Sequence, residues 1–172
     1  MNLREEILRE HSKKQCDKIV AWVGADQQRF DELFRLFSSG EYRVVQRSGW
    51  PMAYCVEKHP AFMKKHFATL LKNVKRTDLH VAVKRNTLRL LQDIDIPVKF
   101  RGEIMNLCFE WLQTSAETIA VKAFSLSVLK NLANDHPEII PEVKLIIEEM
   151  LPRETAAFRS RAKQFLKATT TK

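Results

Sequence analysis

A helical stripe that recurs every 37 to 39 residues constrains the fold of this chain more than any other feature. Four segments place apolar residues at i, i+3, i+4 and i+7, the spacing of one face of an α-helix. The segments begin at Phe30, Phe67, Ile104 and Val143. A period of this length is typical of arrays in which stacked helix pairs share one continuous core.

A second apolar stripe interleaves with the first and repeats at separations of 38, 38 and 37 residues. Its four starting residues are branched or aromatic: Val45, Val83, Val121 and Phe158. The side chain four residues after each start is small, at Gly49, Thr87, Ser125 and Ala162. Because small residues let neighbouring helices approach closely, the two stripes together predict stacked helix pairs.

Proline and capping residues divide the chain between these stripes. Pro60, Pro97 and Pro137 stand where the first helix of a pair begins, a position at which a missing N–H costs nothing. Asp78 and Ser115 stand where a second helix needs an N-cap. The chain holds only 4 Gly and 6 Pro, too few for the many turns of a β-sandwich or barrel.

We therefore expect one all-α domain over residues 1–172, in which a capping helix near residues 3–23 precedes four helix pairs. The four repeats are expected at 26–58, 60–94, 97–134 and 137–168, with their second helices over 41–58, 78–94, 115–134 and 154–168. Pro51 falls inside the first of these second helices, which should kink or begin late there.

The cysteines and the N-terminal segment point to the cytoplasm. Cys16, Cys55 and Cys108 are odd in number, far apart and set among apolar neighbours, which is typical of reduced thiols in a core. The first residues carry charges every few positions, whereas a secretory signal peptide needs an uninterrupted apolar stretch of about 7 to 15 residues.

The second helices resemble those of the HEAT-repeat family. In that family an acidic or polar start precedes a branched or aromatic residue and then a basic one. The matching residues are Asp78, Val83 and Lys84; Glu117, Val121 and Lys122; Glu154, Phe158 and Arg159; and Glu41 with Val45, where Gln46 departs from the basic position. The resemblance covers roughly residues 26–168, and the chain is also similar to small bacterial HEAT-like proteins of unknown role.

This resemblance implies a right-handed α-α superhelix, a HEAT-like or armadillo-like α-solenoid. Such solenoids act as scaffolds whose curved inner face, lined by the second helices, binds proteins or nucleic acid. The resemblance thus implies a non-catalytic module, and it does not identify the partner or the oligomeric state.

Charge is segregated along the chain, whose net charge is +8. Residues 1–57 are balanced, residues 58–101 carry 11 basic and 3 acidic side chains, residues 102–152 are net acidic, and residues 153–172 are net basic. If sequence neighbours stay together in space, these blocks form alternating bands rather than one cationic face. The basic band of residues 58–101 leaves nucleic acid open as a partner.

The candidate binding residues lie on the second helices. They are Arg43, Arg47, Trp50, Tyr54, Lys84, Arg85, Arg89 and Lys122. Around Trp50 the alternatives are a pocket, with Arg47 and Tyr54 one turn away, or packing that fills a gap against the N-terminal helix. For the basic cluster the alternatives are phosphate binding or ion pairs with acidic residues of adjacent repeats.

No motif for nucleotide or metal chemistry is present, and we expect no cofactor and no metal site. The five histidines are scattered and receive no role. One enzyme alternative remains, because HEAT-like DNA glycosylases that remove alkylated purines place an Asp beside tryptophans in a basic groove. Here Trp22, Trp50 and Trp111 lie in different expected helices, and only Asp93, near a helix end, is available.

The sequence thus favours a cytoplasmic, non-catalytic binding or scaffold protein whose partner is a protein. A nucleic-acid-binding HEAT-like protein is the alternative, and an alkylpurine DNA glycosylase-like enzyme is a more distant one.

Overall fold

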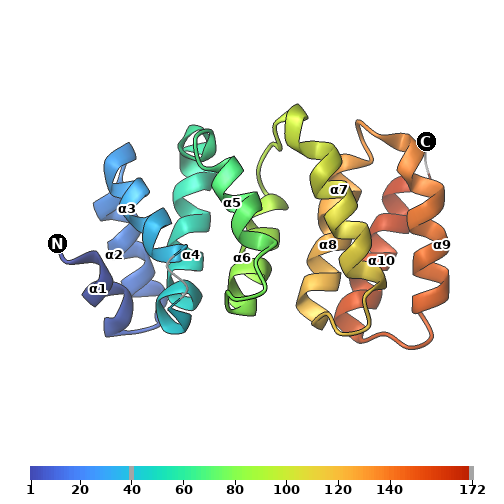
Figure 1. Ribbon diagram of the computed structural model, residues 1–172, viewed down its shortest axis with the longest axis horizontal. Coiled ribbons are helices and arrows are strands. Elements are labelled where there is room, and N and C mark those ends of the chain that lie inside the picture. Colours follow the sequence, from blue (N-terminus) through green and yellow to red (C-terminus); the bar gives the residue numbers. More distant parts are fainter. Residues whose placement is uncertain (39–40, 171–172) are drawn as a thin grey trace. The chain divides into compact units, whose positions relative to one another are not determined.

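Ten α-helices and two short 3₁₀ segments make up the computed structural model, which describes residues 1–38 and 41–170 (Figure 1). No strand occurs within these two ranges, and the predicted all-α fold class is confirmed. The chain divides into two compact units, Met1–Asp95 and Ile96–Lys172. Among the described residues, none of the helices has the length and apolar character needed to cross a membrane.

The first unit contains three helix pairs. They are α1 (Leu3–Arg9) with α2 (Lys13–Val23), α3 (Gln27–Phe37) with α4 (Tyr42–Lys58), and α5 (Phe67–Val74) with α6 (Val81–Leu91). The second helices stack, since α4 packs against both α2 and α6 (Figure 1). A 3₁₀ segment, η1 (Pro60–Met63), leads from α4 toward α5.

The second unit contains two helix pairs built in the same way. They are α7 (Val98–Gln113) with α8 (Ile119–Leu132), and α9 (Ile140–Met150) with α10 (Ala156–Thr169). The second helices again stack, because α8 packs against α10 as well as α7. A 3₁₀ segment, η2 (Pro137–Ile139), precedes α9.

The single helix expected over residues 3–23 is wrong, because the structure breaks it between α1 and α2. Ser12 is the N-cap of α2, and its Oγ accepts a 3.1 Å hydrogen bond from the Gln15 amide. The Gln15 side chain reaches back to α1 and donates to the Glu6 carbonyl oxygen at 2.6 Å. Ser followed three residues later by Gln is the sequence pattern that marks the start of a helix. The N-terminal segment is therefore a helix pair of its own.

The predicted caps of two second helices are also wrong. His80, not Asp78, caps α6, with its Nδ1 accepting a 3.0 Å hydrogen bond from the Ala82 amide. Thr118, not Ser115, caps α8 through a hydrogen bond from the Val121 amide to its Oγ1. The helices consequently begin three and four residues later than the sequence predicts, at Val81 and Ile119, and the Asp78 carboxylate pairs with Arg76 instead.

Pro60 and Pro137 open 3₁₀ segments rather than α-helices. The turn at η1 places Phe62 in the core, where its ring stacks on Phe30 with the centroids 4.9 Å apart. The first helix of the repeat expected at 60–94 is therefore interrupted, and α5 begins only at Phe67. The free energy gained by burying the Phe62 side chain in this turn exceeds what an uninterrupted α-helix would contribute here.

Both sequence stripes face the core, as predicted. The four residues that start the second stripe are at most 2% exposed: Val45, Val83, Val121 and Phe158. The predicted close approach is clearest where α4 meets α6, because a Cβ atom on Gly49 would lie 2.7 Å from Asn86 Cγ. The equivalent small residues Thr87, Ser125 and Ala162 are fully buried.

The three cysteines are free and buried, as the sequence predicts. Burial in apolar surroundings raises the pKa of Cys16 to about 11 and that of both Cys55 and Cys108 to about 12. Thiols with such pKa values remain protonated at neutral pH, so they behave as small apolar side chains rather than as nucleophiles.

Candidate functional site

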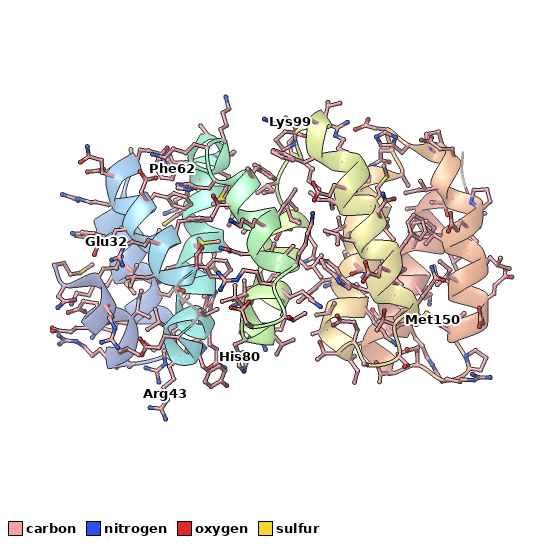
Figure 2. All side chains as sticks on the ribbon, in the orientation of Figure 1. Glu32, Arg43, Phe62, His80, Lys99 and Met150 are labelled. Carbon is pink, nitrogen blue, oxygen red and sulfur yellow. The ribbon has the colours of Figure 1, made fainter. Side chains whose placement is uncertain are left out.

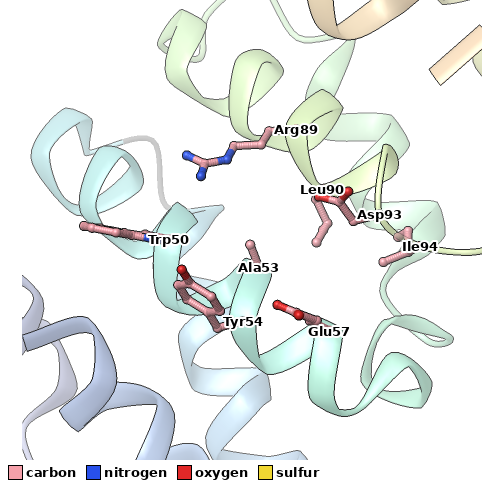
Figure 3. Close-up of a pocket in the computed structure, with 8 residues that line it drawn as sticks. All are labelled: Trp50, Ala53, Tyr54, Glu57, Arg89, Leu90, Asp93 and Ile94. Atoms are coloured by element: carbon pink, nitrogen blue, oxygen red, sulfur yellow. The ribbon is translucent and has the colours of Figure 1, made fainter. Parts of the chain in front are cut away.

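An open groove of about 470 Å³ lies between α4 and α6 in the first unit (Figure 3). We call it the α4–α6 groove. The residues that line it are Trp50, Ala53, Tyr54, Glu57, Arg89, Leu90, Asp93 and Ile94. The α4 residues follow the i, i+3, i+4, i+7 spacing that places side chains on one helical face. The α6 residues continue past the helix end at Leu91 into the following turn.

Pro51 does not interrupt the α4 wall of this groove. The helix runs from Tyr42 to Lys58 with Pro51 buried inside it, so the alternative of a late start is wrong. Proline has no N–H to offer the carbonyl of Arg47 four residues back. The Arg47 side chain leaves the groove, because its Nη1 donates a 2.6 Å hydrogen bond to the Leu8 carbonyl oxygen of the N-terminal pair.

Trp50 takes part in both arrangements that the sequence left open. It lines the α4–α6 groove, and it also borders a small cavity beside the α1–α2 junction. Its ring centroid lies 5.8 Å from that of His11 in the junction and 6.4 Å from that of Tyr54. Trp50 is therefore held against the N-terminal pair while one part of its surface remains accessible in the groove.

Tyr54 is held by a cation from the N-terminal pair. Lys13 Nζ lies 4.4 Å from the centroid of the Tyr54 ring, a cation–π arrangement. The hydrogen bond that Lys13 makes with Asp17 raises the pKa of the Lys13 ammonium, which keeps it charged. Contacts within the protein thus preorganise the aromatic side chains of the groove.

The charged side chains of the groove are separated along its length. Figure 3 shows Arg89 reaching toward Trp50, while Glu57 and Asp93 lie toward the other end of the groove, near Ile94. All three charged residues are exposed. Within the described part of the chain, no residue forms an ion pair with Glu57, Arg89 or Asp93. Their charges are therefore available to a ligand.

The other predicted basic residues lie outside the groove. Arg43 projects from the first turn of α4 into solvent (Figure 2). Lys84 and Arg85 are half-buried in the N-terminal half of α6 and do not line the groove. The structure thus brings together Trp50, Tyr54 and Arg89 from the predicted set, and it places Arg43, Arg47, Lys84 and Arg85 elsewhere in the same unit.

Lys122 belongs to the second unit and forms the inter-repeat ion pair that the sequence offered as the alternative to phosphate binding. Its Nζ lies 3.1 Å from Glu154 Oε1, which joins α8 to the segment that precedes α10. The two side chains are only 11% and 13% exposed. Lys122 thus connects the two helix pairs of the second unit.

The predicted binding set omits two residues of the groove, Glu57 and Asp93, the second of which was considered in the sequence only for the glycosylase-like alternative. A signal for Glu57 exists, because it lies seven residues after Trp50 and so on the same helical face. Asp93 lies beyond the end of α6, where helical periodicity no longer predicts direction. The other tryptophans do not join the groove: Trp22 stacks with Arg29, and Trp111 is buried in α7.

Comparison with protein-family models identifies a match that spans most of the chain. The family model described as a HEAT repeat domain covers residues 3–169. No curated protein and no solved structure matches the chain.

Proposed function

Because the chain belongs to the HEAT-repeat family, we propose that it is a non-catalytic binding module that holds a protein partner in the α4–α6 groove. HEAT repeats generally mediate protein interactions or scaffolding. The observation that carries the proposal is the combination of accessible Trp50 and Tyr54 with the unpaired Arg89 in one open groove. Trp, Tyr and Arg are the residues that most often dominate the energetics of protein interfaces.

The proposal extends to domain organisation and location. The matched family model runs through both compact units, which supports a single domain over residues 1–172. Three buried, unbridged cysteines support a reducing compartment, the cytoplasm.

The test is partner capture with matched tryptophan variants. The wild-type protein, Trp50→Ala and Trp22→Ala are each tagged, and co-purified proteins are quantified after nuclease treatment. Trp22 is the control because it lies outside the groove and stacks with Arg29. We expect the partner to bind Trp22→Ala like wild type and to bind Trp50→Ala about 30-fold more weakly, the effect of truncating a buried hot spot. Equal partner binding by both variants would contradict the proposal, provided thermal unfolding shows both to be folded.

Nucleic acid is the second candidate, and Arg89 beside Trp50 and Tyr54 is the observation that favours it. Aromatic stacking and a cation suit single-stranded nucleic acid, but Glu57 and Asp93 repel phosphate in the same groove. A nucleic-acid binder loses affinity with salt at a log–log slope of about −0.9 per neutralised phosphate on duplex DNA. A triple variant that combines Lys84→Glu, Arg85→Glu and Arg89→Glu would bind nucleic acid with a flatter salt dependence. A protein-binding module should instead show no salt-dependent binding of nucleic acid.

The glycosylase-like alternative has a direct assay. Asp93 does line a groove with Trp50, although Trp22 and Trp111 do not. Incubation of the protein with alkylated duplex DNA, followed by chromatography of free bases, tests it. We expect no base release by wild type above an Asp93→Asn control.

A further inference from the structure

We infer that the α4–α6 groove recognises an extended protein segment carrying a lysine or arginine and an aspartate or glutamate about three residues apart. This inference rests on the proposed function and specifies the chemistry of the partner. Arg89 would hold the acidic side chain, while Glu57 and Asp93 would hold the basic one.

The first step in the argument is that the groove is electrically polarised. Its cation, Arg89, extends toward Trp50, and its two carboxylates lie farther along both walls (Figure 3). Because no described residue forms an ion pair with these three side chains, their charges are not neutralised within the first unit. A ligand with charges of a single sign would be attracted at one end of the groove and repelled at the other. The groove therefore favours a ligand that carries separated charges of both signs.

The second step is the distance between the two ends. Arg89 extends toward Trp50 (Figure 3), and Trp50 and Glu57 are seven residues apart on α4, which corresponds to about 10 Å along the helix axis at 1.5 Å per residue. On the other wall, Asp93 follows Arg89 by only four residues. Three residues of an extended, polyproline-like chain span about 9 Å and return side chains to the same face. A spacing of three between the acidic and basic residues of the ligand therefore matches the length of the α4 wall from Trp50 to Glu57.

The third step is the chemistry between the charged ends. The rings of Trp50 and Tyr54 lie on one wall, and Ala53, Leu90 and Ile94 complete an apolar lining. Aromatic-lined grooves bind polyproline-like segments because such segments are already extended and lose little conformational entropy on binding. Nucleic acid carries no cationic group to pair with Glu57 and Asp93, which repel its phosphates, and a small cation leaves Arg89 and the aromatic wall without a partner.

The experiment measures binding of labelled peptides by fluorescence polarisation. Each peptide is acetylated, amidated and proline-rich, and it carries one lysine and one glutamate at spacings from one to five in both orders. Wild type should bind best at a spacing of three in one order. Arg89→Gln should lose about three- to tenfold in affinity, and only for peptides that contain the glutamate. The double variant Glu57→Gln, Asp93→Asn should lose a similar factor, and only for peptides that contain the lysine.

A charge-swapped pair supplies the positive control. Arg89→Glu should prefer a peptide with lysine at both positions, which wild type binds poorly. All three substituted residues are exposed, and unchanged thermal unfolding verifies that the variants are folded. Peptide binding without charge or spacing preference would overturn this inference, and so would losses independent of peptide charge. Spermidine or oligothymidine competing as well as the best peptide would overturn it too.

The two proposals fail in different ways. If captured partners are lost in Trp50→Ala but remain in Arg89→Gln and in Glu57→Gln, Asp93→Asn, the groove binds protein and only the charge inference is wrong. If Trp50→Ala retains every partner, the proposed use of the groove is itself wrong.

Discussion

Gly49 of α4 lies directly against the side chain of Asn86 in α6, and a Cβ atom added there would sit 2.7 Å from Asn86 Cγ and 3.2 Å from Asn86 Cβ. The absence of a side chain at Gly49 therefore allows α4 and α6, the two walls of the α4–α6 groove, to approach each other this closely.

Gly49→Ala should destabilise the protein by about 1 kcal/mol, because the clash with Asn86 exceeds the helix propensity that alanine gains. In an Asn86→Ala background the same change should instead stabilise by up to about 1 kcal/mol, since only the 3.2 Å contact with Cβ remains. Urea unfolding of the four proteins gives the double-mutant cycle. A Gly49→Ala effect of equal sign in both backgrounds would contradict this account.

Lys122→Met should cost about 2 kcal/mol of unfolding free energy. The substitution leaves the Glu154 carboxylate, 13% exposed, without its cation. Adding Glu154→Gln should recover most of the loss, because the double variant removes the unpaired charge. The control is Arg76→Gln, which breaks an exposed pair with Asp78 and should cost less than about 0.5 kcal/mol. Similar losses in Lys122→Met and Arg76→Gln would show that burial of the pair contributes nothing.

The Asp31 carboxylate should make the free energy of unfolding fall at acidic pH. Desolvation favours a raised pKa for its carboxyl group, but hydrogen bonds from Lys65, Gln27 and His66 outweigh it and hold the pKa of Asp31 below its ordinary value. The His66 Nε2 bond to Asp31 Oδ1 is 2.7 Å. Because the folded-state pKa is the lower one, the unfolded chain takes up the proton first as the pH falls. The stabilisation is thus complete above about pH 4, near the unfolded-state pKa, and is lost as the pH falls through the folded-state pKa.

Urea unfolding at several pH values from 7 down to 3 tests this. Wild type should lose more stability than Asp31→Asn over the acidic part of that range, while Asp31→Asn should already be less stable at pH 7. Asp17→Asn, which removes an exposed carboxylate that pairs with Lys13 on its own helix, is the control and should follow wild type. Parallel pH curves for wild type and Asp31→Asn would rule out a role for this carboxylate.

Thiol labelling should distinguish the folded from the unfolded chain. At pH 8 the native protein should react with an aromatic disulfide reagent about a hundredfold more slowly than the urea-unfolded protein, because all three thiols are buried and their pKa values are raised to about 11 or 12. Rapid labelling of one thiol in the native protein would show that its helix opens readily.

Periodicity predicted the helices and the core well, and it failed where local chemistry decides. The stripes through Val45 and Val83 are buried as expected, because repeated helical spacing leaves one inward face. The break before α2 was missed, since apolar positions continue through it and only the Ser12 and Gln15 cap marks it. In the sequence Asp93 stands near the end of the helix expected over 78–94, whereas the structure places it past the end of α6, where backbone direction depends on the turn rather than on a repeat. The groove could thus be predicted from α4 but not from both of its walls.

In an ideal repeat array each helix pair contacts only the pairs beside it, and the units can drift in sequence almost independently. α4 is the centre of these contacts in the first unit, because it packs against its pair partner α3 and against both neighbouring pairs through α1, α2 and α6. A substitution in any of the first three pairs is therefore felt by the same helix that presents Trp50 and Tyr54. Among relatives of this protein, we expect changes in α4 to be accompanied by compensating changes in all three pairs, so that the N-terminal half diverges as one block.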